Sequence, residues 1–304
     1  MEQQLTRIAV KIGSNVLTRR DVTRMSALVD QIAGLHKAGV EIILVSSGAV
    51  ASGRSEIHPT KKLDSVDQRQ LFSAVGQAKL INRYYELFRE HGIPVGQVLT
   101  MKENFGTRRH YLNQKNCMTV MLENGVIPIV NENDTISVSE LMFTDNDELS
   151  GLIASMMDVQ ALIILSNIDG IYNGSPADPA SEVIREIEHG KDLSSYIQTS
   201  KSSFGRGGML TKTNIARKVA DEGITVIIAN GKRDNILTDI LRNEELRMKN
   251  EELKYTRFIP SPEPVSSVKK WIAHSEGFAK GELHINECAT KILASDKAVS
   301  ILPI

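Results

Sequence analysis

The first 230 residues of the chain alternate between two patterns of apolar positions. Short, nearly continuous apolar runs predict strands buried on both faces, and longer segments with apolar residues three or four positions apart predict helices. The predicted strands span residues 7–12, 41–46, 94–99, 126–130, 161–165 and 225–229. Because helical segments separate most of these strands, we expect an α/β fold with an open, mostly parallel sheet between helix layers.

Glycines mark the ends of two predicted helices. Apolar residues at helical spacing run from Met25 to Leu35 and are followed by Gly39, and a long helical segment over 68–90 is followed by Gly92. Glycine commonly ends helices because it adopts the left-handed conformation without strain. Residues 135–143 place apolar among polar residues without helical spacing, which predicts a β-hairpin or ribbon.

The composition changes after about residue 242. Residues 243–254 are densely charged, which is typical of a solvated helix or a linker, and Pro260, Pro262 and Pro264 follow. Proline-rich segments favour linkers. We therefore predict an α/β domain over 1–255, a linker over 256–267 and a short C-terminal tail over 268–304.

The charge balance argues against several classes of protein. The 304 residues hold 36 Lys and Arg against 37 Asp and Glu, which does not favour a nucleic-acid or membrane-binding surface. Cys117 and Cys288 are too few and too far apart for a disulfide framework or a zinc pattern, and the scattered histidines show no metal-ligand spacing. The N-terminus lacks a signal-peptide pattern, and no apolar stretch approaches the ~20 residues of a membrane span. We expect a cytoplasmic protein.

Four segments near the ends of predicted strands carry candidate chemistry, because ligands of open α/β sheets bind beyond the carboxyl ends of the strands. In the first, KIGSN at 11–15, Lys11 can neutralise phosphate charge and Gly13 lets the backbone approach a ligand. In another, FGRGGMLTK at 204–212, three glycines precede a helix with Lys212 in its first turn, an arrangement suited to phosphate. The alternatives are a solvated lysine at a strand end and a mobile surface loop.

The other two segments are SSGAVASG at 46–53 and the acidic pair NEND at 131–134 with TDNDE at 144–148. Small residues at a helix start expose amides that bind anions, although a tight turn also needs glycine. The acidic pair can hold an amino group, Mg2+ or a lysine, although such residues also form turns and helix caps. Together the four segments fit phosphoryl transfer. The chain contains no GxxxxGK[ST] or GxGxxG motif, so a P-loop, a dinucleotide fingerprint and a protein-kinase glycine loop are excluded.

These motifs resemble the amino acid kinase family: KIGS at 11–14, SSGA at 46–49, NEND at 131–134, DND at 145–147 and GGMLTK at 207–212. The acidic pair, with AVGQ at 74–77, QVLT at 97–100 and YLN at 111–113, is similar to the branch that phosphorylates the side-chain carboxylate of L-glutamate. The resemblance covers about residues 5–242. It implies an eight-stranded open sheet, with ATP over one half and the amino acid over the other. Mg2+ should be held mainly by the phosphates of ATP, as is usual in such sites, and we assign it no protein side chain.

The resemblance also implies roles for individual residues. Lys11 and Lys212 stabilise the transferring γ-phosphoryl group, and Asp147 positions them. The implied glutamate-binding residues are Ser47, Gly48, Ala49, Asp134 and Asn146. The implied nucleotide-binding residues are Lys11, Gly13, Ser14, Ser166, Asn167, Arg206, Gly207, Gly208, Met209, Leu210, Thr211 and Lys212.

Two positions depart from the family pattern, and the tail raises a separate question. Asn167 stands where members usually carry Asp, and Arg206 where they often carry Thr. Residues 271–304 resemble the beginning of a PUA domain, but only part of one, so we assign no RNA binding. The resemblance further implies a homo-oligomer, proline as feedback inhibitor and a hand-off to glutamyl phosphate reductase. The alternatives are a related small-acid kinase of the acetylglutamate type and a non-catalytic regulatory protein on the same fold.

Overall fold

The computed structural model describes residues 6–17, 22–137, 143, 146–176, 178–191, 209–246, 253–263, 265–274, 286–287 and 290–291. An eight-stranded sheet runs through this part of the chain in the order β3-β4-β2-β1-β5-β7-β8-β6. Its strands are β1 (Arg7–Ile12), β2 (Glu41–Ser46), β3 (Val95–Thr100), β4 (Ile127–Glu132), β5 (Ala161–Ser166), β6 (Glu186–Ile187), β7 (Thr225–Asn230) and β8 (Tyr255–Phe258). Only the β7–β8 pairing among these strands is antiparallel, which confirms the predicted mostly parallel sheet.

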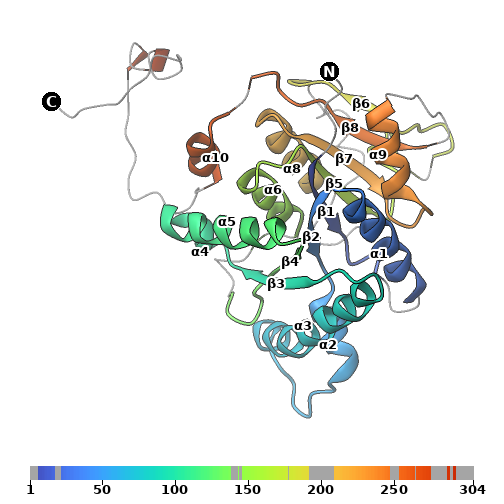
Figure 1. Ribbon diagram of the computed structural model, residues 1–304, viewed down its shortest axis with the longest axis vertical. Helices are drawn as coiled ribbons and strands as arrows, with labels where there is room; N and C mark the ends of the chain where they lie inside the picture. Colours follow the sequence, from blue (N-terminus) through green and yellow to red (C-terminus); the bar gives the residue numbers. More distant parts are fainter. Residues whose placement is uncertain are drawn as a thin grey trace.

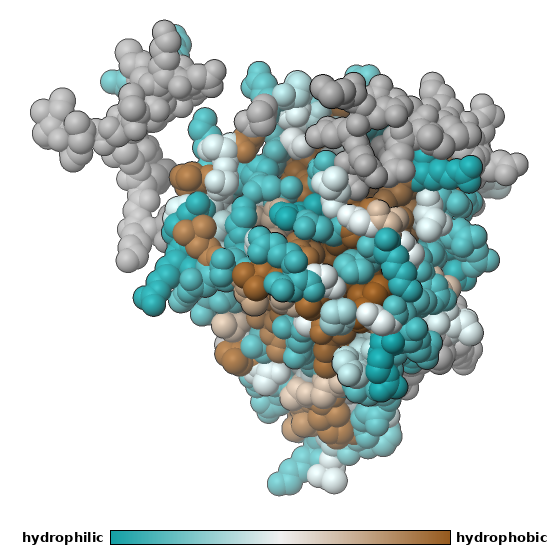
Figure 2. Space-filling view, in the orientation of Figure 1, coloured by the Kyte–Doolittle hydropathy of each residue, from teal (hydrophilic) through white to brown (hydrophobic). Residues whose placement is uncertain are grey.

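Helices cover both faces of the sheet (Figure 1). They are α1 (Val22–Lys37), α2 (Ala49–Glu56), α3 (Ser65–Glu90), α4 (Glu103–Gly106), α5 (Arg108–Glu123), α6 (Asn146–Met156), α8 (Met209–Asp221), α9 (Ile236–Leu246) and α10 (Ser267–His274). One apolar cluster joins the sheet to α1, α3 and α9, and a second joins its other face to α5, α6 and α8. On the face shown in Figure 2, hydrophobic residues lie among hydrophilic ones, as expected where amphipathic helices form the outer layers.

Alternation along β1 decides which way its lysine points. Ile8, Val10 and Ile12 belong to the cluster beneath α1, α3 and α9, whereas Ala9 belongs to the cluster beneath α6 and α8. Successive side chains of a strand face opposite sides of the sheet. Lys11 therefore shares the face of Ala9 and lies under α6 and α8.

Glycines shape both the helix ends and one helix contact. Gly39 and Gly92 adopt left-handed conformations with φ of 93° and 70°, directly after the helices they were predicted to end. Gly53 and Gly76 let α2 and α3 touch backbone to backbone. A Cβ atom at Gly76 would lie 1.8 Å from the carbonyl oxygen of Ala49, so the position accepts no side chain without movement of a helix.

The C-terminal part of the sheet corrects one prediction. The linker expected over 256–267 is wrong for its first three residues, because Thr256 to Phe258 lie in β8 and pair with β7. Thr256 is fully buried, and its hydroxyl accepts a hydrogen bond from the Ile171 amide and donates one to the Ile184 carbonyl. The strand was missed because it is short and lies between a charged segment and prolines.

Two further expectations lie partly beyond the described residues. In the ribbon expected over 135–143, residues 134–136 form a turn, and 138–142 lie outside the described part of the chain. The tail begins with α10, where the Trp271 indole donates to the Phe105 carbonyl at 2.9 Å. Of residues 275–304 the structure describes four, so the PUA-like tail remains a prediction. Among the helices described, none combines the length and apolarity that crossing a membrane requires.

Candidate active site

The carboxyl ends of the central strands lie side by side. The pairing of β1 sets Ile12 opposite Ser46 of β2 on one side and opposite Leu165 of β5 on the other. The strand β4 continues the same edge beyond β2. The segments at 11–15, 46–53 and 131–134 therefore meet at the carboxyl ends of the strands, as expected for an open α/β fold.

Two lysines distant in sequence share one buried carboxylate. The ammonium nitrogen of Lys11 lies 2.5 Å from Oδ1 of Asp147, and that of Lys212 lies 2.7 Å from Oδ2. The side chains of Asp147, Lys11 and Lys212 are 1%, 6% and 14% exposed. Asp147 stands in the first turn of α6, and Lys212 in the first turn of α8.

The charges of this cluster fix the protonation of its carboxyl group. Burial alone would raise the pKa of Asp147, but attraction to and hydrogen bonds from Lys11 and Lys212 more than offset it, so its pKa lies below the ordinary value. Asp147 is therefore ionised at neutral pH and has no proton to donate. Two ammonium groups against one carboxylate leave the cluster with a net positive charge, which suits the binding of phosphate oxygens.

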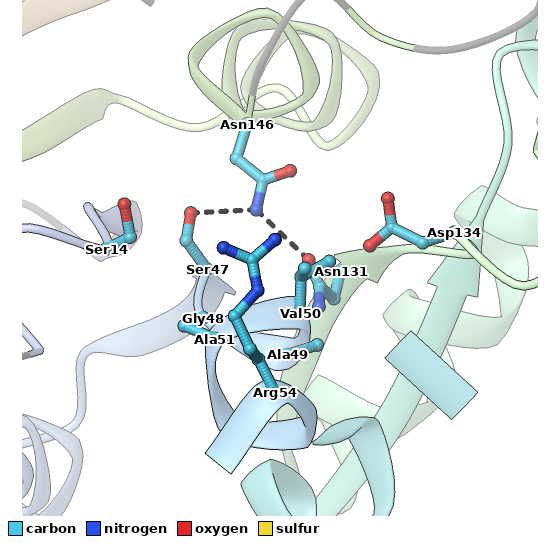
Figure 3. A pocket seen from close by; sticks show the side chains of 10 residues that line it. All are labelled: Ser14, Ser47, Gly48, Ala49, Val50, Ala51, Arg54, Asn131, Asp134 and Asn146. Atoms are coloured by element: carbon cyan, nitrogen blue, oxygen red, sulfur yellow. Dashed lines mark hydrogen bonds between the residues drawn. The ribbon is translucent and has the colours of Figure 1, made fainter. Parts of the chain in front are cut away.

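A cavity of about 310 Å³ is lined in part by Asn146, the residue that precedes Asp147 in α6 (Figure 3). Its lining comes from the loop after β1, the turn after β2 together with α2, the end of β4 and the turn that follows it, and the start of α6: Ser14, Ser47, Gly48, Ala49, Val50, Ala51, Arg54, Asn131, Asp134 and Asn146. All five predicted glutamate-binding residues are among them. Ser14, predicted for the nucleotide, lines the same cavity.

Asn146 ties three walls of the cavity together. Its side-chain amide donates to the Ser46 carbonyl at 2.9 Å, to the Ser47 hydroxyl at 2.8 Å and to Oδ1 of Asn131 at 3.0 Å. Asn131 in turn donates to the Gln77 side chain of α3 at 2.7 Å. The side-chain oxygen of Asn146 takes no part in these contacts with the walls. It can therefore accept a hydrogen bond from a ligand in the cavity.

The start of α2 gives the cavity a positive pole. Gly48 caps this helix with φ of 109° and, without a side chain, gives its first amides no capping hydrogen bond. The first amides of any helix have no partner within the helix, and its dipole favours anions there. Arg54, from the last turn of α2, points into the cavity (Figure 3), and its guanidinium lies 5.4 Å from the centre of the Phe72 ring.

Asp134, the acidic residue in the cavity wall, belongs to a salt bridge that the sequence did not suggest. Arg69 of α3 donates from Nε to Oδ1 of Asp134 at 2.6 Å and from Nη2 to Oε2 of Glu132 at 2.8 Å. The other carboxylate oxygen of Glu132 accepts the Phe143 amide at 3.1 Å. Burial and the charge of Asp134 raise the pKa of Glu132 to about 7, although Arg69 and the Phe143 amide oppose this shift.

The predicted nucleotide-binding residues lie in several places. The Gly13 amide donates to the Leu165 carbonyl at 3.2 Å, which joins the turn after β1 to the end of β5. Ser166 ends β5 and is buried, and Asn167 follows it. Met209, Leu210 and Thr211 begin α8 with Lys212. Arg206, Gly207 and Gly208 lie outside the described residues.

Near Asn167, a carboxylate is available two residues further along. Asp169 accepts a hydrogen bond from Asn230 at 3.0 Å and forms an ion pair with Arg233 at 3.1 Å. These contacts link the loop after β5 to the end of β7. The departure at Asn167 therefore does not leave this side of the sheet without a negative charge.

The described residues do not fit a protein-bound metal. No group of three or more His, Cys, Asp or Glu side chains converges among them. The acidic side chains nearest the cavity are already paired, Asp147 with two lysines and Asp134 and Glu132 with Arg69. These carboxylates position other side chains rather than offering an open set of oxygen ligands.

Comparison with known proteins places this arrangement in a family. The model of the amino acid kinase family matches residues 6–230. Glutamate 5-kinase of Bacteroides thetaiotaomicron is 85% identical over 308 residues, which cover 100% of this chain and 84% of that protein. Glutamate 5-kinase of Chlorobaculum tepidum is 47% identical, over 98% of this chain and 81% of that protein.

Solved structures show the same fold at low identity. UMP kinase from Ureaplasma parvum superposes with a TM-score of 0.54 at 15% identity, over 84% of this chain and 100% of that one. Isopentenyl phosphate kinase from T. acidophilum superposes with a TM-score of 0.56 at 14% identity, over 83% and 100%. At such identities the likeness concerns the fold alone.

Proposed function

The chain belongs to the amino acid kinase family, within its glutamate 5-kinase branch, and from this premise we propose how its site works. The enzyme transfers the γ-phosphoryl group of ATP to the side-chain carboxylate of L-glutamate. The products are L-glutamyl 5-phosphate and ADP, and the reaction is the first step of proline biosynthesis. The observation that supports the site is the cluster of Lys11, Asp147 and Lys212 beside a cavity with one negative and one positive pole.

The two poles of the cavity match the two ends of an amino acid. Asp134 receives the substrate ammonium group, and the side-chain carbonyl of Asn146 accepts a further hydrogen bond from it. The α-carboxylate lies at the start of α2, against the Ser47 hydroxyl and the amides of Gly48 and Ala49, and Arg54 supplies a cation. The side-chain carboxylate then points toward Lys11. Each contact pairs a charged group with a partner of opposite charge or a suitable donor.

The chemical step needs no general base. A side-chain carboxyl of free glutamate titrates near ~4.3, so the attacking oxygen is already ionised at neutral pH. One of its oxygens forms a bond to the γ-phosphorus while the bond from that phosphorus to the bridging oxygen of ADP breaks. Lys11 and Lys212 stabilise the charge on the transferring group, and ionised Asp147 holds both ammonium groups in place.

We propose that Mg2+ reaches the site on the phosphates of ATP, where it supplies further positive charge. The carboxylates of the described site are engaged with lysines and arginine, so no step here depends on a metal held by the protein. Lys11, Gly13, Ser14, Ser166, Asn167 and 206–212 are the proposed nucleotide-binding residues.

The test is ADP release with Mg-ATP and glutamate, with hydroxylamine present to trap the acyl phosphate as its hydroxamate. Glutamate-dependent ADP release with matching hydroxamate is expected, and acetylglutamate and aspartate run in parallel. Turnover only with one of these other acids would overturn the substrate assignment. Lys11→Ala and Lys212→Ala should each reduce turnover by about 10²–10³-fold, the effect of losing one charge-stabilising group. Near-normal turnover in both variants would reject their roles.

The family relationship supports further proposals about partners. We propose a cytoplasmic homo-oligomer that proline inhibits by competing at or beside the glutamate cavity. Because an acyl phosphate hydrolyses readily, the product is handed to glutamyl phosphate reductase. A glutamate KM that rises with proline concentration, while the ATP KM stays constant, is the expected signature of such competition.

A further inference from the structure

Asp134 is the one acidic residue among the ten that line the cavity. It is 8% exposed, and a second carboxyl group, Glu132, lies behind it with 4% exposure. Two carboxylates this close repel each other, and burial strengthens the repulsion. Arg69 lies between them and carries the positive charge that offsets it.

We propose that Arg69 is a positioning residue that sets the affinity for the substrate ammonium group by holding the carboxylate of Asp134 in the cavity wall. The inference rests on the proposed function, in which Asp134 receives that ammonium group. Arg69 does not line the cavity and acts through Asp134. Its side chain is 27% exposed, and its guanidinium contacts both carboxylates.

The geometry uses the fork of the guanidinium. The Nε atom of Arg69 donates to Asp134 and its Nη2 atom donates to Glu132. Because the guanidinium is rigid and planar, it fixes the spacing of these two carboxylates, which stand two residues apart at the end of β4. Glu132 also accepts the amide of Phe143, three residues before Asn146. Arg69 therefore fixes Asp134 directly and, through Glu132, contacts the backbone of Phe143 indirectly.

The charges around Glu132 make this arrangement sensitive to pH. It faces Asp134 from the turn after β4, Arg69 from α3, the Phe143 amide, and Glu148 from α6, which is itself paired with Lys102 at the start of α4. As pH rises through about 7, Glu132 ionises and the acidic wall becomes more negative. Binding of an ammonium group should therefore strengthen over that range. Without Arg69 the same ionisation should require a higher pH, because a cation that lowers the pKa of Glu132 is gone.

The experiment compares wild type, Arg69→Gln and Arg69→Lys in steady-state kinetics from pH 6 to 9, with separate KM values for glutamate and ATP. Arg69→Gln should raise the glutamate KM by about 10- to 100-fold, as expected for the loss of hydrogen bonds between charged groups. The ATP KM should stay within about twofold, because the lysine cluster is untouched. In wild type, kcat/KM for glutamate should rise through pH 7, and in Arg69→Gln that rise should move to higher pH. Arg69→Lys keeps the charge and should restore most of the affinity.

Arg7→Gln is the matched control. Arg7 is also 27% exposed and also donates from Nε to a carboxylate, that of Glu41, at 2.6 Å. It is the first residue of β1 and therefore lies at the amino ends of the strands, away from the site. It should leave both KM values and the pH profile unchanged. An unchanged glutamate KM in Arg69→Gln would overturn the proposal, and so would equal losses for glutamate and ATP.

Glu132→Gln covers the case in which Arg69→Gln does not fold. It removes the group whose ionisation is invoked, so the rise in kcat/KM for glutamate through pH 7 should disappear. Persistence of that rise would overturn the proposal. A wild-type enzyme without glutamate-dependent turnover would instead overturn the proposed function, which keeps the two failures distinguishable.

Discussion

Replacing Asp147 by Asn tests the buried lysine cluster most directly. The substitution keeps the size of the side chain and removes its negative charge, which leaves Lys11 and Lys212 facing each other without a counter-ion. Two costs follow, since each buried ammonium loses its partner and the two repel one another. Breaking a buried ion pair by removing one partner costs about 3–5 kcal/mol.

This cost converts into a measurable change in melting temperature. For domains of roughly 150–250 residues, 1 kcal/mol shifts Tm by about 2–4 °C, so the variant should melt about 6–20 °C below wild type. The sign of the pH dependence follows from the lowered pKa of Asp147. Its stabilisation is present above the unfolded value near ~3.9 and is lost as pH falls through the folded value. The gap between the two proteins should therefore persist from neutral pH to about 4 and narrow only below it.

ATP should rescue the variant more than wild type. The phosphates replace the missing negative charge between the lysines, so the rise in Tm on adding saturating Mg-ATP should be larger in Asp147→Asn. A ligand at 100 times its Kd adds about 2.7 kcal/mol, which is enough to recover much of the loss. Turnover should nevertheless fall, because the lysines are no longer held in place before the phosphoryl group arrives.

Asp158→Asn is the matched control for this experiment. Asp158 also lies between two lysines, Lys115 at 2.7 Å and Lys270 at 3.0 Å, but it is 44% exposed. Because water reaches the Asp158 carboxylate, both ion pairs are screened even though the Lys270 side chain is only 9% exposed. This variant should therefore lose less stability than Asp147→Asn and gain nothing extra from ATP. Equal losses in the two variants, or an unchanged response of Asp147→Asn to ATP, would refute the role of burial in the argument.

Three other substitutions test separate parts of the structure. Gly76→Ala should destabilise the protein by more than ~3 kcal/mol in urea denaturation, because its Cβ would lie 1.8 Å from the carbonyl oxygen of Ala49. Gly34→Ala, whose Cβ would have nothing within 4 Å, should be neutral or slightly stabilising, and similar losses at both positions would contradict the close contact. Glu132→Gln should gain stability relative to wild type between pH 5 and pH 8, because the raised pKa of Glu132 makes wild type lose stability as pH rises from about 4.5 to about 7. If that pKa were ordinary, urea denaturation would give the same difference in unfolding free energy between the two proteins at both pH values. Trp271→Phe should lose about 1 kcal/mol of stability, because it removes the hydrogen bond to a backbone carbonyl of α4. Trp271→Ala should lose more, because it also removes the packing of the ring. An equal loss in the two variants would show that this packing does not hold α10 in place.

The parts of the fold that the sequence predicts are those where a local pattern records burial. Five strands, β1, β2, β4, β5 and β7, appear as apolar runs because a central parallel strand is buried on both faces, whereas β3 lies at the end of the sheet and is partly exposed. The largest error at a strand end is at β4, where the polar Asn131 and Glu132 continue the strand into the site. Apolar content does not reveal such an end. The short strands β6 and β8 carry too few residues to form a pattern.

The candidate site divides in the same way between local and distant signals. Lys11, Ser47 and Asp134 stand beside strand ends and were singled out from the sequence. Arg69 was not, because its partners lie 63 and 65 residues away and nothing in its own helix distinguishes it from other charged positions. Arg54 likewise belongs to a helix whose direction only the three-dimensional structure defines. The missed residues are cations on helices, and their role depends on what the fold places in front of them.

The start of α6 explains how the two halves of the site are coupled. Asn146 and Asp147 are neighbours in sequence, and successive residues of a helix point about 100° apart. Asn146 therefore faces the cavity proposed for glutamate and bonds to Ser47, while Asp147 faces the lysines. Under the proposed function, a shift of this one helical turn would move the bound acceptor carboxylate and the two lysines together. Such a construction keeps the two reacting groups in register, which is the chief requirement of a transfer that needs no base.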